Sequence, residues 1–268
     1  MKKVVFITGI SSGFGQSIAE QLAAKEYIVY GTVRKEAENK PGINVLKMDL
    51  MDPASIKSAV SQVLQKEGRI DVLINNAGMH TGGSIETSPV EYAKLQMDTN
   101  VMGMVHVLRE VLPGMRKQQS GTVINFSSIG GLMGLPFQGF YSASKFAIEG
   151  LSEALRMEVK PFGIKVVAIR PGDFHTHNTA NRRNYLATDA TDPYAGQFKK
   201  TLAIIEKDEN GGWPPEVLAK KIVNIVEKKN PCHSYVIASM EQKLAVVLKR
   251  ILPAGWFFKI LAPHYGIK

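Results

Sequence analysis

Short apolar runs and longer amphipathic stretches alternate along this chain. The apolar runs predict buried strands at residues 4–8, 27–33, 43–48, 71–75, 122–128, 163–170 and 233–238. Apolar residues at helical spacing predict helices that begin near residues 15, 53, 89, 141 and 213. This order of strands and helices is typical of an α/β fold with a parallel sheet. Because no linker, repeat or low-complexity segment interrupts it, we expect residues 1–268 to form one domain.

Two segments depart from this alternation. Residues 177–212 are polar and weakly patterned, and an irregular stretch of that length is usually functional or mobile. The tail, residues 240–268, alternates Leu244, Val247 and Ile251 with basic residues and predicts an amphipathic helical segment. No apolar run approaches the ~20 residues of a membrane span.

The composition is that of an ordinary globular protein. The 268 residues are 44% hydrophobic and 21% charged, with a formal net charge of +9. Because the Lys and Arg residues are scattered, a solvated basic surface is favoured over binding to nucleic acid. The single cysteine, Cys232, excludes an intrachain disulfide and fits a reducing compartment. Gly9 and the polar residues after it cut the first apolar run short, so no secretory signal is apparent and a cytoplasmic location is expected.

A glycine-rich turn follows the first predicted strand. Its pattern, Thr8-Gly9-x-x-x-Gly13-x-Gly15, leads directly into a helix. Glycines allow the backbone to turn tightly and approach a pyrophosphate, and the amides and dipole of the helix N-terminus favour its negative charge. The position of this turn directly after a strand favours nucleotide binding over a purely structural turn.

Tyr141 and Lys145 are candidates for acid/base chemistry. Residues four apart on a helix lie on the same face, so the two side chains can act together. A nearby ammonium favours the phenolate, so we expect it to lower the pKa of Tyr141 and to make this side chain a general acid/base. Ser128 ends a predicted strand, which places its hydroxyl at the carboxyl edge of the sheet, where open α/β folds bind ligands.

These motifs resemble those of the short-chain dehydrogenase/reductase family. The resemblance covers roughly residues 1–240 and includes the glycine turn, Asn-Asn-Ala-Gly at 75–78, and Ser128 followed by Tyr-x-x-x-Lys at 141–145. Asn100 and Pro-Gly at 171–172, with Thr176 after it, complete the pattern. The family resemblance implies a Rossmann-type, doubly wound parallel sheet of about seven strands with helices on both faces. It also implies reversible hydride transfer between a nicotinamide cofactor and a carbonyl or secondary alcohol.

The same resemblance assigns a role to each catalytic candidate. Tyr141 exchanges a proton with the substrate oxygen, and Ser128 holds that oxygen by a hydrogen bond. Lys145 lowers the pKa of Tyr141 and binds the nicotinamide ribose. Asn100 binds a water molecule that links Lys145 to solvent.

The cofactor site is expected to prefer NADP(H). Val33 occupies the position of the family's NAD-type aspartate, and the neighbouring Arg34 resembles its NADP-selecting arginine. Glu36 and Glu38 nearby keep NAD(H) open as the alternative. The family pattern places the following residues at the cofactor: Gly9, Ser11, Ser12, Gly13, Phe14, Gly15, Arg34, Asp49, Leu50, Asn76, Ala77, Gly78, Tyr141, Lys145, Pro171, Gly172, Phe174 and Thr176.

Residues 128–137 look especially like the corresponding part of hydroxysteroid and retinol dehydrogenases. This suggests a bulky apolar, steroid- or retinoid-like ketone, aldehyde or alcohol, bound by Ser128, Leu135, Phe137 and Tyr141. Further candidates for the pocket wall are Met133, Phe140, Tyr185, Tyr194 and Phe198. Residues 177–212 occupy the place of the family's substrate lid. The tail can lie on a membrane surface, but packing over the substrate entrance or a subunit interface is the favoured interpretation.

Other interpretations differ in chemistry or in assembly. A protein that binds NADP and regulates a partner without turnover is the main alternative, although the presence of Tyr141 and Lys145 favours the enzyme. His175 and His177 suggest a metal site, but no third His or Cys stands at ligand spacing, so no metal is expected. The apolar faces of the helix that ends near Met115 and of the helix after Tyr141 suit subunit pairing, so a homodimer or homotetramer is expected.

Overall fold

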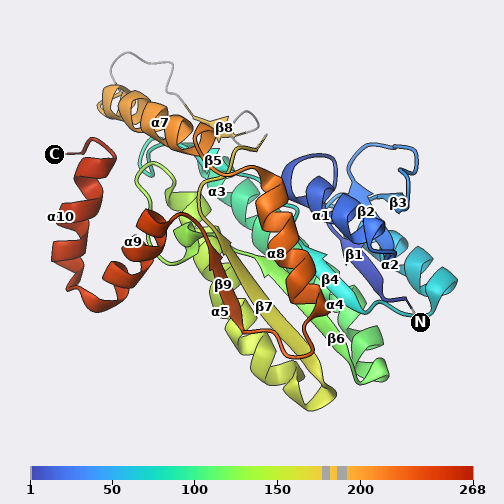
Figure 1. Cartoon of the computed structure of the whole chain (residues 1–268). Coiled ribbons are helices and arrows are strands. Elements are labelled where there is room, and N and C mark those ends of the chain that lie inside the picture. The colour runs from blue at the N-terminus through green and yellow to red at the C-terminus, as the bar shows by residue number, and fades with distance from the viewer. Residues whose placement is uncertain (1, 177–181, 186–191, 268) are drawn as a thin grey trace.

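Seven parallel strands form one sheet at the centre of the computed structural model, which describes residues 2–176, 182–185 and 192–267 (Figure 1). Along the sheet the order is β3-β2-β1-β4-β6-β7-β9. The strands span Val4–Ile7 (β1), Ile28–Val33 (β2), Ile43–Lys47 (β3), Val72–Asn75 (β4), Gly121–Phe126 (β6), Ile164–Pro171 (β7) and Ser234–Ile237 (β9). All seven predicted strands are therefore confirmed, and so is the parallel sheet.

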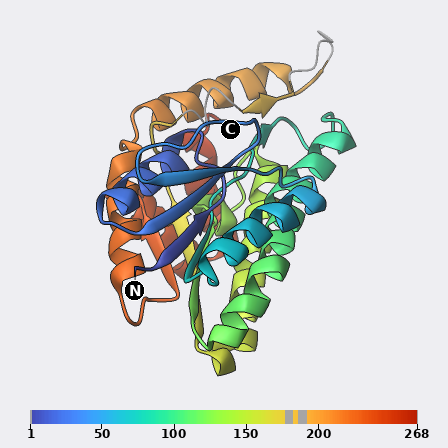
Figure 2. The ribbon, with the colours of Figure 1, turned by 90° about the vertical axis from the view of Figure 1, so that its right-hand side faces the viewer.

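Helices cover both faces of this sheet (Figure 2). On one face α1 (Gly13–Ala24) and α8 (Pro215–Glu227) pack over a core that includes Ile18 and Ile222. On the other face lie α2 (Pro53–Glu67), α4 (Gly103–Gln118) and α5 (Gly139–Val159), whose apolar sides form a second core. Strands buried by helices on both faces read as continuous apolar runs, which is why the sequence pattern identified them.

The ends of α2 show how local sequence sets a boundary. Asp52 caps the helix by accepting a hydrogen bond from the Ala54 N–H at 2.9 Å, and Pro53 occupies the first helical position. Gly68 ends the helix with a φ of +72°, a left-handed conformation that favours glycine.

The direction in which the sheet is wound reverses between β1 and β4. From β1 the chain adds β2 and β3 on one side, then returns to place β4, β6, β7 and β9 on the other. Loops that leave adjacent strands in opposite directions open a crevice above the carboxyl ends of those strands. The functional site is therefore expected above β1 and β4.

The predicted continuous helix over residues 89–115 is interrupted. After α3 (Val90–Met97) comes a five-residue π-helical segment, Asp98–Met102, and only then α4. Such segments are rare and frequently mark functional sites. Here the segment contains Asn100.

Residues 195–210 also differ from the irregular stretch that the sequence suggested. They form α7 (Ala195–Asn210), which buries Phe198, Thr201 and Ile205 and lies across the carboxyl edge of the sheet (Figure 2). A two-stranded sheet pairs β5 (Thr81–Gly82) with β8 (Arg183–Asn184). The rest of the expected lid, residues 177–181 and 186–191, lies outside the described residues.

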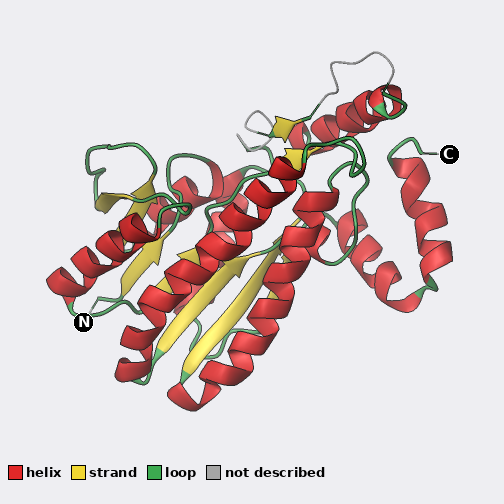
Figure 3. Cartoon of the chain, turned by 180° about the vertical axis from the view of Figure 1, so that it is seen from behind, coloured by secondary structure: helices red, strands yellow, loops and turns green. Residues whose placement is uncertain are grey.

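The tail forms two helices beside the main body, α9 (Met240–Ile251) and α10 (Ala254–His264) (Figures 1 and 3). A capping box begins α9, with Ser239 and Gln242 each bonded to the other's backbone. In the described part of the chain, no helix is both long and apolar enough to cross a membrane.

Candidate active site

A cavity of about 1280 Å³ opens above the carboxyl ends of β1 and β4. One part, the cofactor half, is lined by the loops that leave β1, β2, β3, β4 and β7 and by the start of α1. The other part, the substrate half, is lined by residues 129–138, by Asp173 after β7, and by parts of α7, α9 and α10. Tyr141 and Lys145 line the cavity where the two halves meet.

The glycine turn in the cofactor half fits a pyrophosphate. Gly9 and Gly13 have φ angles of +72° and +58°, which favour glycine. A Cβ atom added to Gly15 would lie 2.0 Å from the Gly9 carbonyl oxygen, so only glycine allows this close approach. Ser12, the N-cap of α1, makes no capping bond with its side chain, and the first turn carries no acidic residue. The helix N-terminus is thus left for an anionic ligand.

Asn76 holds the turn in shape. Its Nδ2 donates hydrogen bonds to the carbonyl oxygens of Thr8 at 3.0 Å and Gly9 at 2.8 Å. The expected cofactor residues all line the cavity except Gly15, whose role is to let the turn pass closely over α1. Phe14 packs edge-on against Phe174, with ring centres 5.0 Å apart. The structure therefore brings together residues that span positions 9 to 176.

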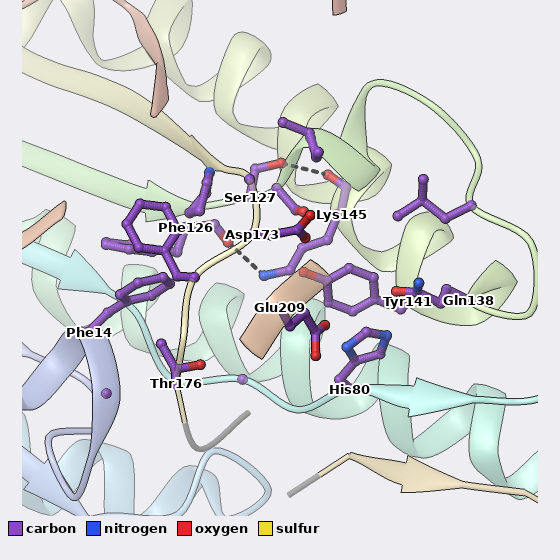
Figure 4. Close-up of a pocket in the computed structure, with 18 of the residues that line it drawn as sticks. Phe14, His80, Phe126, Ser127, Gln138, Tyr141, Lys145, Asp173, Thr176 and Glu209 are labelled. Carbon is purple, nitrogen blue, oxygen red and sulfur yellow. Dashed lines mark hydrogen bonds between the residues drawn. The ribbon is translucent and has the colours of Figure 1, made fainter. Parts of the chain in front are cut away.

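Tyr141 lies on α5 with Lys145 one turn further on (Figure 4). Burial raises the pKa of Tyr141 to about 12, and the hydrogen bond from Ser128 only partly opposes this shift. The sequence-based expectation of a lowered pKa was therefore wrong for this structure. The reason is that the low-polarity surroundings penalise the phenolate more than the neighbouring groups stabilise it.

Lys145 is held by the backbone of β6. Its Nζ donates a hydrogen bond to the Phe126 carbonyl oxygen at 2.8 Å and lies 5.6 Å from the centre of the Tyr141 ring. Burial lowers the pKa of Lys145 to about 8, although Glu149, one further turn along, acts in the opposite direction. Arg170 of β7 holds Glu149 through two buried hydrogen bonds of 2.9 and 2.7 Å. This ion pair fixes α5, and with it both catalytic candidates, to the sheet.

Asn100 lies behind the cavity and does not line it. Its Oδ1 accepts from the Met79 N–H at 2.8 Å, and its Nδ2 donates to the Met79 carbonyl oxygen at 3.0 Å and to Ser144 Oγ at 3.2 Å. Ser144 in turn donates to the Tyr141 carbonyl oxygen at 2.7 Å. The π-helical segment thus connects the loop after β4 to the first turn of α5.

Several polar residues that no sequence motif indicated lie around Tyr141. The His80 ring stacks on Tyr141 with centres 3.9 Å apart, and burial holds the pKa of His80 well below its ordinary value (Figure 4). Arg182 donates to His80 Nδ1 at 3.4 Å and forms an ion pair with Glu209 of α7. Asp173 lies on the other side of Tyr141 (Figure 4). No spacing in the sequence relates these residues, because each comes from a different element.

The substrate half contains only some of the expected residues. Ser128, Leu135 and Met133 line the cavity. Phe137 lies outside the lining and stacks on Phe198, with ring centres 5.3 Å apart, so it holds α7 in place instead. The other aromatic candidates, Phe140, Tyr185, Tyr194 and Phe198, also lie outside the lining. The apolar wall includes Leu248, Phe257 and Leu261 of the tail, none of which the sequence analysis assigned to the pocket.

Comparisons with known proteins match this geometry. Residues 3–186 match the family model described as short chain dehydrogenase. A 3-ketodihydrosphingosine reductase from Bacteroides thetaiotaomicron is 46% identical over 266 residues, which cover 99% of each chain. Human 17-beta-hydroxysteroid dehydrogenase type 1 is 40% identical over 191 residues, 65% of this chain and 58% of its own.

A solved structure gives the same result for the fold. ElxO with NADP bound superposes with a TM-score of 0.72 at 26% identity, covering 89% of this chain and 98% of that one. The glycine turn, the Tyr141–Lys145 pair and these matches agree. This chain is an oxidoreductase that belongs to the short-chain dehydrogenase/reductase family.

Proposed function

We propose that this protein uses NADPH to reduce the ketone of a long-chain amino ketone such as 3-ketodihydrosphingosine. The observation that carries the proposal is the composition of the substrate half, where an apolar wall and two carboxylates surround Tyr141. A substrate of this class has a ketone between a long alkyl chain and a carbon that bears an amine. The wall suits the chain, and the carboxylates suit the ammonium.

The two carboxylates are Asp173 and Glu209 (Figure 4). Both act electrostatically on Tyr141, and both line the cavity. Burial raises the pKa of Asp173 to about 6, and repulsion from Glu209 and Asp208 contributes to the shift. At pH 7 Asp173 is still mostly charged, so a cation bound beside it relieves the repulsion.

The extent of the matches also supports a sphingoid rather than a steroid or retinoid substrate. The Bacteroides reductase matches 99% of this chain and therefore includes α7, α9 and α10, which build the substrate half. The human steroid dehydrogenase matches only 65% of it. Sphingoid, steroid and retinoid substrates are all bulky and apolar, but of these only the sphingoid carries an amine.

Arg34 supports the choice of NADP(H). It is exposed, lines the cavity at the end of β2, and forms no ion pair within the described residues. Glu36, one of the two acidic residues that kept NAD(H) open, pairs with Lys47 at 3.1 Å. Arg34 thus has its guanidinium available for the phosphate that distinguishes NADP from NAD.

When bound, the nicotinamide supplies the hydride. Tyr141, with its pKa near 12, is protonated at neutral pH and donates its proton to the developing alkoxide. Ser128 holds the substrate oxygen; its own Oγ accepts from the Gly130 N–H at 3.0 Å, which fixes the hydroxyl in place. Lys145 is charged below pH 8 and stabilises the phenolate that Tyr141 becomes. The relay of that proton through Asn100 stays a prediction.

The test is turnover by the purified protein with NADPH and with NADH. The substrates are 3-ketodihydrosphingosine, the ketone of the same length without the amine, a steroid ketone and retinal. We expect the highest kcat/KM with NADPH and the amino ketone. A higher kcat/KM for the steroid or retinal contradicts the proposed substrate. Cofactor binding without turnover of any compound favours the regulatory alternative.

A further inference from the structure

The outer side of the tail carries an apolar surface, which we call the outer stripe. Its members are all between 48% and 77% exposed: Met240, Leu244, Val247, Ile251, Trp256 and Phe258. The four on α9 follow one another at intervals of four, three and four residues, so they lie on one face of that helix. The next two belong to the start of α10.

The folding of the tail does not require this stripe. A different face of α9 packs on the body, where Val246 and Phe257 are buried with Met133 and contact Leu248 and Leu252. One apolar face is enough to attach an amphipathic helix. Seven of the sixteen exposed large hydrophobic residues in the described chain nevertheless lie between positions 240 and 260. A concentration of this kind marks an interaction surface.

The charge around the stripe indicates what binds there. Residues 240–267 carry Lys243, Lys249, Arg250 and Lys259 but only one acidic residue, Glu241. Lys249 lies over the rings of Phe257 and Phe258, at 5.3 and 4.8 Å from their centres. A second copy seated on it through the same face would bring these basic residues against one another. An anionic lipid surface attracts it, and aromatic residues next to basic ones are typical of interfacial helices.

The helices that carry the stripe also present an exposed apolar residue to the cavity. Ile260 of α10 is 55% exposed, and it also lines the cavity together with Leu248, Phe257 and Leu261. The helices that present the stripe to solvent are therefore the same helices that wall the substrate half, and they stand at the side of the molecule (Figure 1). A membrane bound at the stripe would therefore lie against the helices that line the substrate half.

We infer that α9 and α10 dock this enzyme on an anionic membrane surface. The outer stripe enters the boundary between headgroups and acyl chains, and the basic residues contact the headgroups. The inference concerns binding to a bilayer and does not depend on which ketone the enzyme reduces.

The test is flotation of the full chain with vesicles of phosphatidylcholine alone or with added phosphatidylglycerol, without substrate. We expect binding to the anionic vesicles that weakens with salt. The triple variant Leu244→Gln, Val247→Gln, Trp256→Gln should lower the partition coefficient at least about tenfold, because partitioning scales with the buried apolar area. The matched control replaces three apolar residues elsewhere that are at least as exposed: Ile85→Gln, Val90→Gln and Met157→Gln. It should bind as the unmodified protein does.

Two results overturn the inference. One is unchanged flotation of the triple variant. The other is absence of vesicle binding by the unmodified protein. If the mass of that protein in solution then rises with its concentration, while the triple variant stays monomeric, a second copy of the chain occupies the stripe. Turnover of a water-soluble ketone by the triple variant serves as the folding control. Full turnover with lost flotation confirms membrane docking, whatever the outcome for the proposed substrate.

Discussion

The two halves of the cavity are built in different ways. The loops of the cofactor half are tied to neighbouring strand ends by backbone hydrogen bonds, such as Thr8 N–H to the Ile74 carbonyl at 3.0 Å and Ile10 N–H to the Thr32 carbonyl at 2.9 Å. In the substrate half, side chains join segments far apart in sequence. Arg182 pairs with Glu209, and Gln242 donates to Asp173 at 2.5 Å.

This difference separates two kinds of specificity. Close backbone approach shapes the glycine turn at the pyrophosphate site, whereas side chains of α7, α9 and α10 line the substrate half. Changes in one half should therefore affect one ligand and spare the other. Tyr141, at the junction, should affect turnover without changing the binding of either ligand.

The largest effect is expected at that junction. Replacing Tyr141→Phe removes the proton donor but keeps the ring that stacks on His80. We expect kcat to fall about a thousandfold, because a positioned general acid contributes about 10²–10⁴ in rate. NADPH affinity, measured by fluorescence titration, should stay within about twofold of the original value. Unchanged turnover would remove Tyr141 from its role.

The variant Gly15→Ala should act on the cofactor alone. The new Cβ would lie 2.0 Å from the Gly9 carbonyl oxygen, so the turn must shift. Such overpacking costs ~1–3 kcal/mol, and we expect NADPH to bind about a hundredfold more weakly. The control is Gly150→Ala, also in a helix, where an added Cβ meets nothing within 4 Å. Equal losses in the two variants would disprove the steric explanation.

A smaller effect is expected from Asp173→Asn in the substrate half. Loss of this carboxylate should raise KM for the amino ketone about tenfold, because a charged hydrogen bond contributes ~1.5–3 kcal/mol and Glu209 remains. KM for the ketone without the amine, and for NADPH, should not change. If KM rises equally for both ketones, Asp173 shapes the cavity and does not recognise the ammonium.

The smallest expected effect is a pH dependence of kcat/KM, which arises from Lys145, where the two halves meet. The pKa of Lys145 is lowered to about 8, so its ammonium is present below pH 8 and is lost as the pH rises through that value. Tyr141 keeps its proton over this range, since its pKa is about 12. We expect kcat/KM for reduction to be about fourfold lower at pH 8.5 than at pH 7. A profile that stays flat to pH 10 would contradict the role of Lys145.

Local pattern alone determined much of this protein. Periodicity predicted all seven strands, because strands covered on both faces leave continuous apolar runs. The spacing of the glycines and of Tyr141 and Lys145 predicted the turn and the shared helix face, because these features depend only on residues close in the chain. These motifs follow the carboxyl ends of parallel strands, so in the folded chain they line the same cavity.

Tertiary structure decided the rest. The direction of the Tyr141 pKa shift depends on burial, which no local pattern reports. The stacking of His80 on Tyr141, and the positions of Asp173 and Glu209 around it, depend on contacts between separate elements. The amphipathic tail was evident in the sequence, but only packing shows which apolar face closes the cavity and which remains exposed. Burial and long-range contact are properties of the folded chain, and these properties set the chemistry of this site.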